Sequence, residues 1–81
     1  MHKSNREIEK HLVEVLEKEH NVIDAEILTA PLGNYADSLT IVDLACDVES
    51  YYNIILEESE FNNWPDMSLR EISKQIESKL L

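Results

Sequence analysis

The sequence predicts an all-α protein, a small four-helix bundle of three main helices and one short helix, with a long loop between the first and second helices. Apolar residues recur at helical spacings of three and four in several segments. Two serine–glutamate pairs, Ser4 with Glu7 and Ser68 with Glu71, have the spacing of capping boxes. Hydrophobic residues make up 43% of the 81 residues, enough for one core. We therefore treat residues 1–81 as a single domain.

The first helix is predicted to begin at Ser4 and to end near Glu19. A serine hydroxyl and a glutamate carboxylate three residues on can each accept from the other's exposed backbone N–H. The stripe that this helix would bury consists of Ile8, Leu12, Val15 and Leu16. The pair His20-Asn21 ends the pattern.

A long connection follows, because the helical period is lost between Val22 and Asp37. Pro31 and Gly33, the only glycine, break regular structure near its end. Apolar residues of this run that can still be buried are Val22, Ile23, Ile27, Leu28 and Leu32. Loops of this length in compact domains are often functional. We expect this one to cross the end of the bundle.

The second helix is predicted to start at Ser38, with Asp37 as its N-cap. One face carries a core stripe, made of Ile41, Leu44, Ala45, Val48 and Tyr52. A different face carries a second apolar patch flanked by acids, made of Leu39, Val42 and Cys46 with Asp43, Asp47 and Glu49. A helix with one buried face needs no second apolar patch, so this pattern predicts an exposed protein-recognition surface. The alternative is a central helix that is buried nearly all round.

The rest of the chain predicts two further elements. Residues 53–56 are expected to turn their apolar side chains towards the core, and Phe61 and Trp64 to anchor a short helix or turn that Pro65 limits. The aromatic side chains could fill the bundle or line an opening. Ser68 opens a final helix with a clean apolar stripe, made of Leu69, Ile72, Ile76 and Leu80.

Charge and composition exclude several classes of partner. Seven basic and 17 acidic residues give a net charge of −10 and a pI near 4.5, which opposes binding to nucleic acid or to an anionic membrane and favours basic protein surfaces. The single cysteine, Cys46, excludes an internal disulfide framework and fits a reducing compartment. No apolar run approaches the roughly 20 residues that span a bilayer. We therefore expect a cytoplasmic monomer without membrane insertion.

No residue pattern predicts catalysis or a metal site. His2, His11 and His20 are too widely spaced to suggest a compact metal triad, and we expect His2 and His20 to be solvated. Cys46 has no CxxC partner. Ser38 lacks the G-x-S-x-G elbow of a hydrolase and has no evident base. The chain is therefore not expected to be an enzyme.

Over nearly the whole chain these features resemble the acyl carrier protein family: a capped helix, a long loop, D-S-L at residues 37–39, an acid-rimmed second helix and a final amphipathic helix. The resemblance implies that a separate phosphopantetheinyl transferase esterifies Ser38 with phosphopantetheine, beside the helix cap Asp37. The arm's thiol would carry an acyl or aminoacyl thioester. By position the resemblance also implies a partner surface at Leu39, Val42, Asp43, Cys46 and Asp47, for a loading ligase and a downstream synthase or transferase.

The cargo stays open, with fatty acid and secondary metabolite biosynthesis among the pathways. Residues 60–64, Glu-Phe-Asn-Asn-Trp, are similar to the E-F…W stretch of D-alanyl carrier proteins, although the spacing is shorter. Two positions depart from the family pattern: Gly33 lies four residues before Asp37 rather than two, and Thr40 replaces a common acid. The rival hypothesis is an unmodified acidic helical adaptor that binds through Leu39, Val42 and Cys46, with Ser38 only part of the cap.

Overall fold

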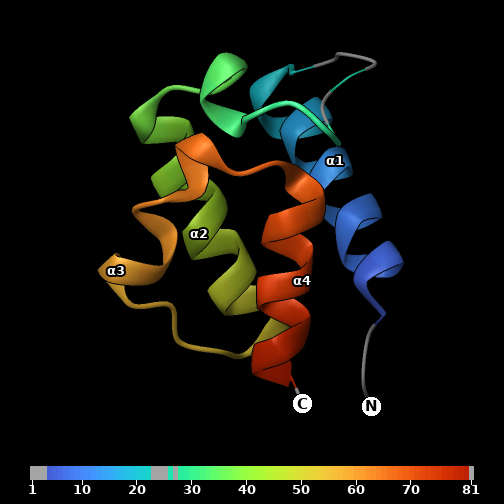
Figure 1. Ribbon diagram of the computed structural model, residues 1–81, viewed down its shortest axis with the longest axis vertical. Coiled ribbons are helices and arrows are strands. Elements are labelled where there is room, and N and C mark those ends of the chain that lie inside the picture. Colours follow the sequence, from blue (N-terminus) through green and yellow to red (C-terminus); the bar gives the residue numbers. More distant parts are fainter. Residues whose placement is uncertain (1–3, 23–25, 27, 81) are drawn as a thin grey trace.

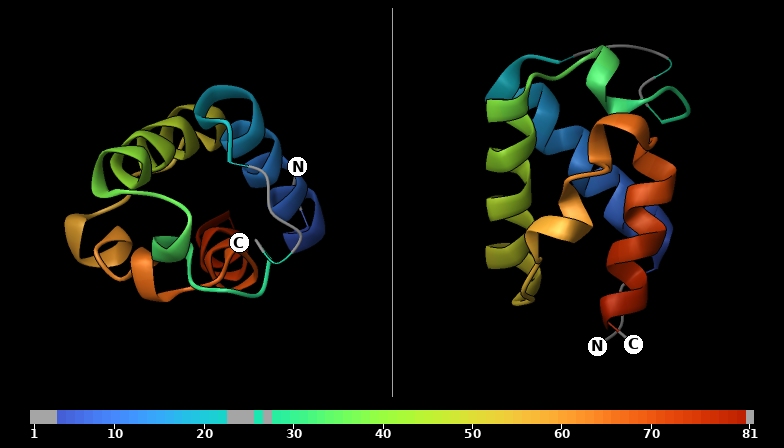
Figure 2. Two further views of the ribbon diagram at one scale, coloured as in Figure 1. Left: turned by 90° about the horizontal axis from the view of Figure 1, so that it is seen from above. Right: turned by 60° about the vertical axis from the view of Figure 1, so that its left-hand side comes forward.

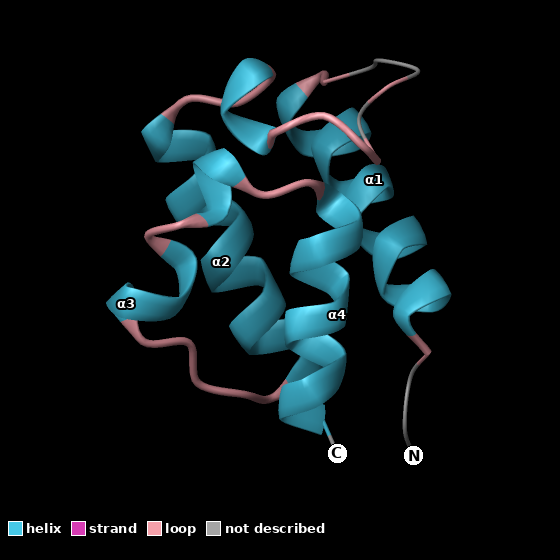
Figure 3. Cartoon of the chain, viewed as in Figure 1, coloured by secondary structure: helices cyan, strands magenta, loops and turns pink. Residues whose placement is uncertain are grey.

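A computed structural model of the chain, which describes residues 4–22, 26 and 28–80, is helical with loops throughout that part (Figure 3). The elements in order are α1 (Asn5–His20), η1 (Leu32–Asn34), α2 (Ser38–Tyr52), α3 (Glu58–Phe61), η2 (Trp64–Asp66) and α4 (Leu69–Leu80). The η elements are single turns of 3₁₀ helix. The predicted all-α bundle of three main helices and one short helix is confirmed.

The three long helices lie alongside one another, and α1 is antiparallel to both α2 and α4 (Figure 1). α1 runs towards the end of the bundle at which α2 begins, α2 runs back, and α4 runs in the same direction as α2. The described part of the connection between α1 and α2 that contains η1, residues 28–37, lies over this end (Figure 2). The end of α1 and the start of α2 are therefore neighbours, and His20 of α1 lies close to Asp43 of α2.

Local capping fixes the limits of α1. The Ser4 hydroxyl accepts from the Glu7 backbone N–H at 3.3 Å. At the other end Asn21 adopts the left-handed conformation, φ 57° and ψ 33°, which asparagine tolerates and which stops the helix. Ile8, Leu12 and Leu16 are fully buried, while Val15 is half-buried. The start and end expected from the sequence are confirmed.

The loop is held by a close approach to η2. Buried Leu32 donates its backbone N–H to the Met67 carbonyl at 2.8 Å. A Cβ on Gly33 would lie 2.9 Å from the Pro65 carbonyl oxygen, so only glycine fits without a shift. Val22 and Leu28 are half-buried, and the predictions for Ile23 and Ile27 lie outside the described residues.

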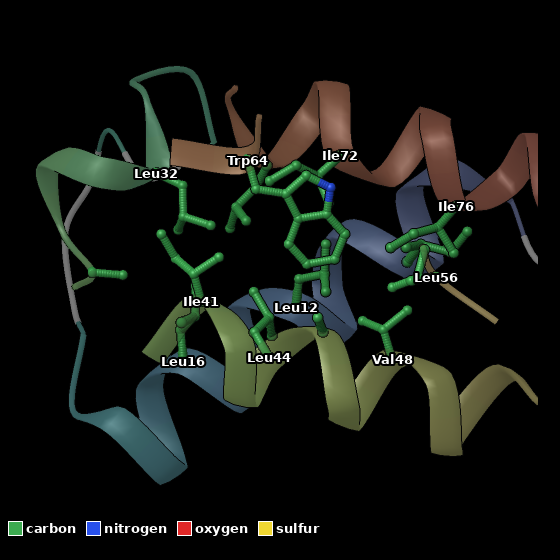
Figure 4. Packing of buried hydrophobic residues seen from close by; sticks show 14 residues of the cluster. Leu12, Leu16, Leu32, Ile41, Leu44, Val48, Leu56, Trp64, Ile72 and Ile76 are labelled. Carbon is green, nitrogen blue, oxygen red and sulfur yellow. The ribbon is translucent and has the colours of Figure 1, made fainter. Parts of the chain in front are cut away.

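Trp64 occupies the middle of the core (Figure 4). Its indole lies between Leu12 of α1, Leu44 of α2 and Ile72 of α4, and its N–H donates to the Gln75 Oε1 at 2.9 Å. A buried indole N–H needs such a partner, since an unpaired one would be costly. Of the two possibilities left open by the sequence, Trp64 fills the bundle.

One prediction about the segment after α2 is wrong. Leu56 is buried and Ile54 half-buried, but Ile55 is 78% exposed. α2 ends at Tyr52, its C-cap Asn53 adopts the left-handed conformation, and the chain then runs on without helix to Glu57. Because residues 54–56 lie outside a helix, no helical face gathers their side chains towards the core, and Ile55 lies exposed between two more buried neighbours.

The capping box predicted for the last helix is confirmed. The Glu71 N–H donates to the Ser68 hydroxyl at 3.2 Å, and the Ser68 N–H donates to the Glu71 carboxylate at 3.1 Å. Leu69, Ile72 and Ile76 are fully buried, and Leu80 is half-buried. The single turn α3 has a similar box between Glu57 and Glu60.

Candidate functional site

Ser38 is the first residue of α2 and is exposed. The preceding Asp37 has extended backbone angles, φ −82° and ψ 176°, and its Oδ1 accepts from the Thr40 N–H at 2.8 Å. The Ile41 N–H donates to the Asp37 carbonyl at 3.0 Å, which begins the helical ladder. The predicted N-cap at Asp37 is confirmed, and it fixes Ser38 in the first turn.

The surroundings of the Ser38 hydroxyl suit an attached anion. Within the described part of the chain, no hydrogen bond is recorded for the Ser38 hydroxyl or for the backbone N–H groups of Ser38 and Leu39. These are two of the donors that every helix leaves unpaired at its start, where the macrodipole is positive. A phosphate ester on the Ser38 oxygen could therefore be stabilised by the helix end itself.

Asp37 is held in its anionic form. The hydrogen bond from the Thr40 backbone N–H lowers the pKa of Asp37 below its usual 3.8, the Thr40 hydroxyl adds to this, and His20 makes a smaller contribution. The carboxylate is therefore charged and acts as a cap throughout the neutral range. The site pairs a fixed cap with a free hydroxyl on the next residue.

An apolar patch continues along α2 from Ser38. Leu39 is 79% exposed and Val42 is 47% exposed, and Cys46 is exposed as well. The opposite face of the helix buries Ile41 and Leu44. The alternative of a helix buried nearly all round is therefore wrong, and the expected exposed patch is present; that it binds partners stays a prediction.

The acids beside the patch differ in their surroundings. Asp43 has a side chain that is 63% exposed, with its Oδ2 3.3 Å from the His20 Nε2. The His20 side chain is only 15% exposed, so the prediction that it is solvated is wrong. The reason is the packing of the last turn of α1 against the first turns of α2. This contact has the distance of an ion pair but not the geometry of a hydrogen bond.

Asp47 is half-buried and forms a carboxyl pair with Glu19 of α1. A hydrogen bond to Asp47, together with the repulsion of its charge, raises the pKa of Glu19 above the usual 4.5. The buried Asp47 Oδ2 has no other hydrogen-bond partner among the described residues. A proton shared with Glu19 would supply that partner. Asp47 is thus less available to a partner protein than Asp43.

Two residues near the site were missed by sequence reasoning, His20 and Glu19. Each acts through a contact between α1 and α2 that no local pattern encodes. Further along the same pair of helices His11 stacks on Tyr51, with ring centroids 3.9 Å apart, and its Nδ1 lies 3.1 Å from the Tyr52 hydroxyl. Burial, followed by the nearby Tyr51 and Glu7, raises the pKa of Tyr52 to about 12. The ring contacts of His11 with Tyr51 and Tyr52 thus help to pack α1 against α2.

Among the residues that the structure describes, no group of three or more histidine, cysteine, aspartate or glutamate side chains is placed to hold a metal ion. No helix in that part of the chain is long and apolar enough to cross a membrane. Comparison of the sequence and fold with models of known families, with curated proteins and with solved structures finds no match.

Proposed function

We propose that this chain is a carrier protein, on which Ser38 bears a phosphopantetheine arm. The observation that carries the proposal is the exposed Ser38 hydroxyl in the first turn of α2, fixed by the Asp37 cap and followed on the same helix by the exposed Leu39 and Val42. The D-S-L tripeptide at residues 37–39 and the order of elements support the proposal, because they resemble the pattern of the acyl carrier protein family.

The proposed chemistry places few demands on this chain. The Ser38 oxygen forms a phosphodiester with the phosphopantetheine of coenzyme A, whose 3′,5′-ADP portion leaves, and the transferase removes the hydroxyl proton. The chain contributes an accessible hydroxyl and a helix start that favours the phosphodiester charge. The arm's thiol then takes up an acyl or aminoacyl group as a thioester from a separate ligase.

In this proposal the exposed face of α2 is the surface that partners recognise. Leu39 and Val42 supply apolar area within reach of the arm, and Asp43 supplies negative charge at its edge. Apolar area surrounded by charged groups is typical of transient interfaces. Covalent tethering raises the local concentration of the cargo at each partner's active site. The transferase, the ligase and a downstream synthase or transferase would all use this face.

Intact mass spectrometry tests the proposal. Purified protein is incubated with coenzyme A and a phosphopantetheinyl transferase of broad specificity, beside the Ser38→Ala and Ser59→Ala variants. Ser59 is a suitable control because it is an exposed serine in the first turn of another helix, α3. One added phosphopantetheine on the wild type and on Ser59→Ala, with none on Ser38→Ala, is the expected result. Unmodified protein with a native circular dichroism spectrum contradicts it.

The rival function is an unmodified adaptor, and the exposed apolar patch by itself supports it. Leu39 and Val42 would present the same surface whether or not Ser38 is modified. The two functions differ in their dependence on the hydroxyl. An adaptor keeps its partner when Ser38 is alanine, whereas a carrier loses cargo transfer completely.

A further inference from the structure

A groove with a volume of about 810 Å³ runs between α1 and α4. It lies on the side of α1 that faces α4, whereas the side towards α2 carries His11, Val15 and Glu19. The half-buried side chains of Val13 and Leu28 provide apolar surface in it. α2 lies on the other side of the bundle (Figure 2), so this groove is separate from the surface around Ser38.

The groove gathers much of the positive charge of an acidic chain. Arg6 and Lys10, one helical turn apart, line it from α1, and Arg70 and Lys74, also one turn apart, line it from α4. These are four of the chain's seven basic residues, and all four are exposed. Two long helices therefore present facing pairs of cations, each pair spaced by about 6 Å along its helix axis.

The carboxylates of the groove balance only half of this positive charge. The Arg70 Nε lies 3.4 Å from the Glu9 Oε1, and Glu9 is mostly buried, with 12% of its side chain exposed. No ion pair forms between a described residue and Arg6, Lys10 or Lys74. Glu9 and Glu14 are the two carboxylates in the lining, so the charged side chains of the groove sum to +2 while the whole chain carries −10.

We propose that this groove binds an acidic amphipathic segment of a partner protein. Facing cations on two helices match carboxylates on both sides of such a segment, and Val13 and Leu28 match its apolar side. An extended anionic surface, such as a membrane or a nucleic acid duplex, would meet the strongly acidic remainder of the molecule as well, and is disfavoured by it. A narrow segment within the groove avoids this repulsion.

Fluorescence anisotropy tests the proposal at about 20 mM salt, where charge attraction is least screened. The probe is a fluorescein-labelled peptide of about 15 residues, long enough for several helical turns, with leucine and glutamate at amphipathic spacing. Its control has glutamine in place of every glutamate. The protein variants are Lys10→Glu, Lys74→Glu and the matched control Lys18→Glu, an exposed lysine of α1 outside the groove.

The expected result is binding of the glutamate peptide only, roughly fivefold weaker with either groove variant and little changed with Lys18→Glu. Amide NMR shifts of the wild type should change at Val13 and Leu28 and not at Val42. If circular dichroism shows that a charge-reversal variant is not folded, Lys10→Gln and Lys74→Gln are used in place of Lys10→Glu and Lys74→Glu.

Three outcomes overturn the proposal. The first is the absence of binding to the wild type. The second is an equal loss of affinity in Lys18→Glu, which would reflect net charge alone. The third is tighter, Lys10-dependent binding to phosphatidylglycerol vesicles, which would assign the groove to a lipid surface. None of these depends on whether Ser38 is modified.

Discussion

Asp37 combines two roles through one hydrogen bond. Accepting from the Thr40 N–H caps α2, and the same bond keeps the carboxylate ionised. Since its pKa is lower in the folded chain than in the unfolded chain, this contribution to stability is complete above the usual value of 3.8 and is lost as the pH falls through the lower folded value. The start of α2, and with it the setting of Ser38, therefore depends on a charge that persists at neutral pH.

Replacing Asp37 tests the cap. In Asp37→Ala the Thr40 N–H loses its acceptor, and we expect a lower urea midpoint at pH 7; Asp37→Asn keeps an acceptor oxygen and should lose less. As the pH falls through the lowered pKa of Asp37, the wild type and Asp37→Asn should converge, because the wild-type carboxyl becomes protonated. Equal midpoints for all three proteins at pH 7 would contradict the capping role.

The carboxyl pair of Glu19 and Asp47 has the opposite pH dependence. The pKa of Glu19 is raised above 4.5 in the folded chain, so its ionised form costs stability at neutral pH and the cost disappears as the pH falls towards 4.5. We expect Glu19→Gln to melt at least as high as the wild type at pH 7 and to lose the gain in melting temperature that the wild type shows as the pH falls from 7 towards 4.5. Glu17→Gln, an exposed change on the same helix, is the control. Glu17→Gln should keep the gain of the wild type, and an equal gain in Glu19→Gln would contradict the pairing.

At the scale of the element, α2 has two apolar faces with different tasks. Ile41, Leu44 and Val48 are buried, and Leu39 and Val42 are exposed. The periodicity of the sequence predicted both faces, because the angle between residues on a helix is fixed by geometry. It could not predict Ile55, whose exposure depends on where α2 ends and on the non-helical segment that follows.

Two lysine substitutions on α2 separate these tasks. We expect Val42→Lys to slow transfer of phosphopantetheine at least several-fold while the helical circular dichroism stays near that of the wild type, since the side chain is already 47% exposed. Val48→Lys, a fully buried position on the same helix, should unfold the protein, because an unpaired buried charge costs several kcal/mol. Loss of folding in Val42→Lys would instead place that residue in the core.

At the scale of the whole molecule, the helices could be predicted from the sequence, but the contacts between them could not. Capping pairs act over three residues, so the starts of α1, α2 and α4 were predicted. The contacts of His20 with Asp43 and of Glu19 with Asp47 join separate helices and have no local signal. The same is true of the groove, whose cations come from the two ends of the chain.

Salt dependence is a prediction about the molecule's total charge. With a net charge of −10, the chain should meet basic partners faster than an uncharged protein would, and added salt should screen this attraction. We expect kcat/KM for phosphopantetheine transfer to fall roughly tenfold between about 20 mM and 500 mM salt. The transferase's turnover of a neutral substrate of low molecular mass serves as the control. A salt-independent rate would count against steering by charge.

The α1/α4 groove, whose charged side chains sum to +2, is separate from the acidic edge of α2, and this uneven distribution of charge contributes a dipole in addition to the net charge. A dipole in the field of another protein experiences a torque, so the molecule is rotated during its approach rather than only attracted. A basic partner would turn α2 towards itself before contact and leave the groove facing away. The chain could then be held by an acidic segment on one side while Ser38 remains accessible on the other.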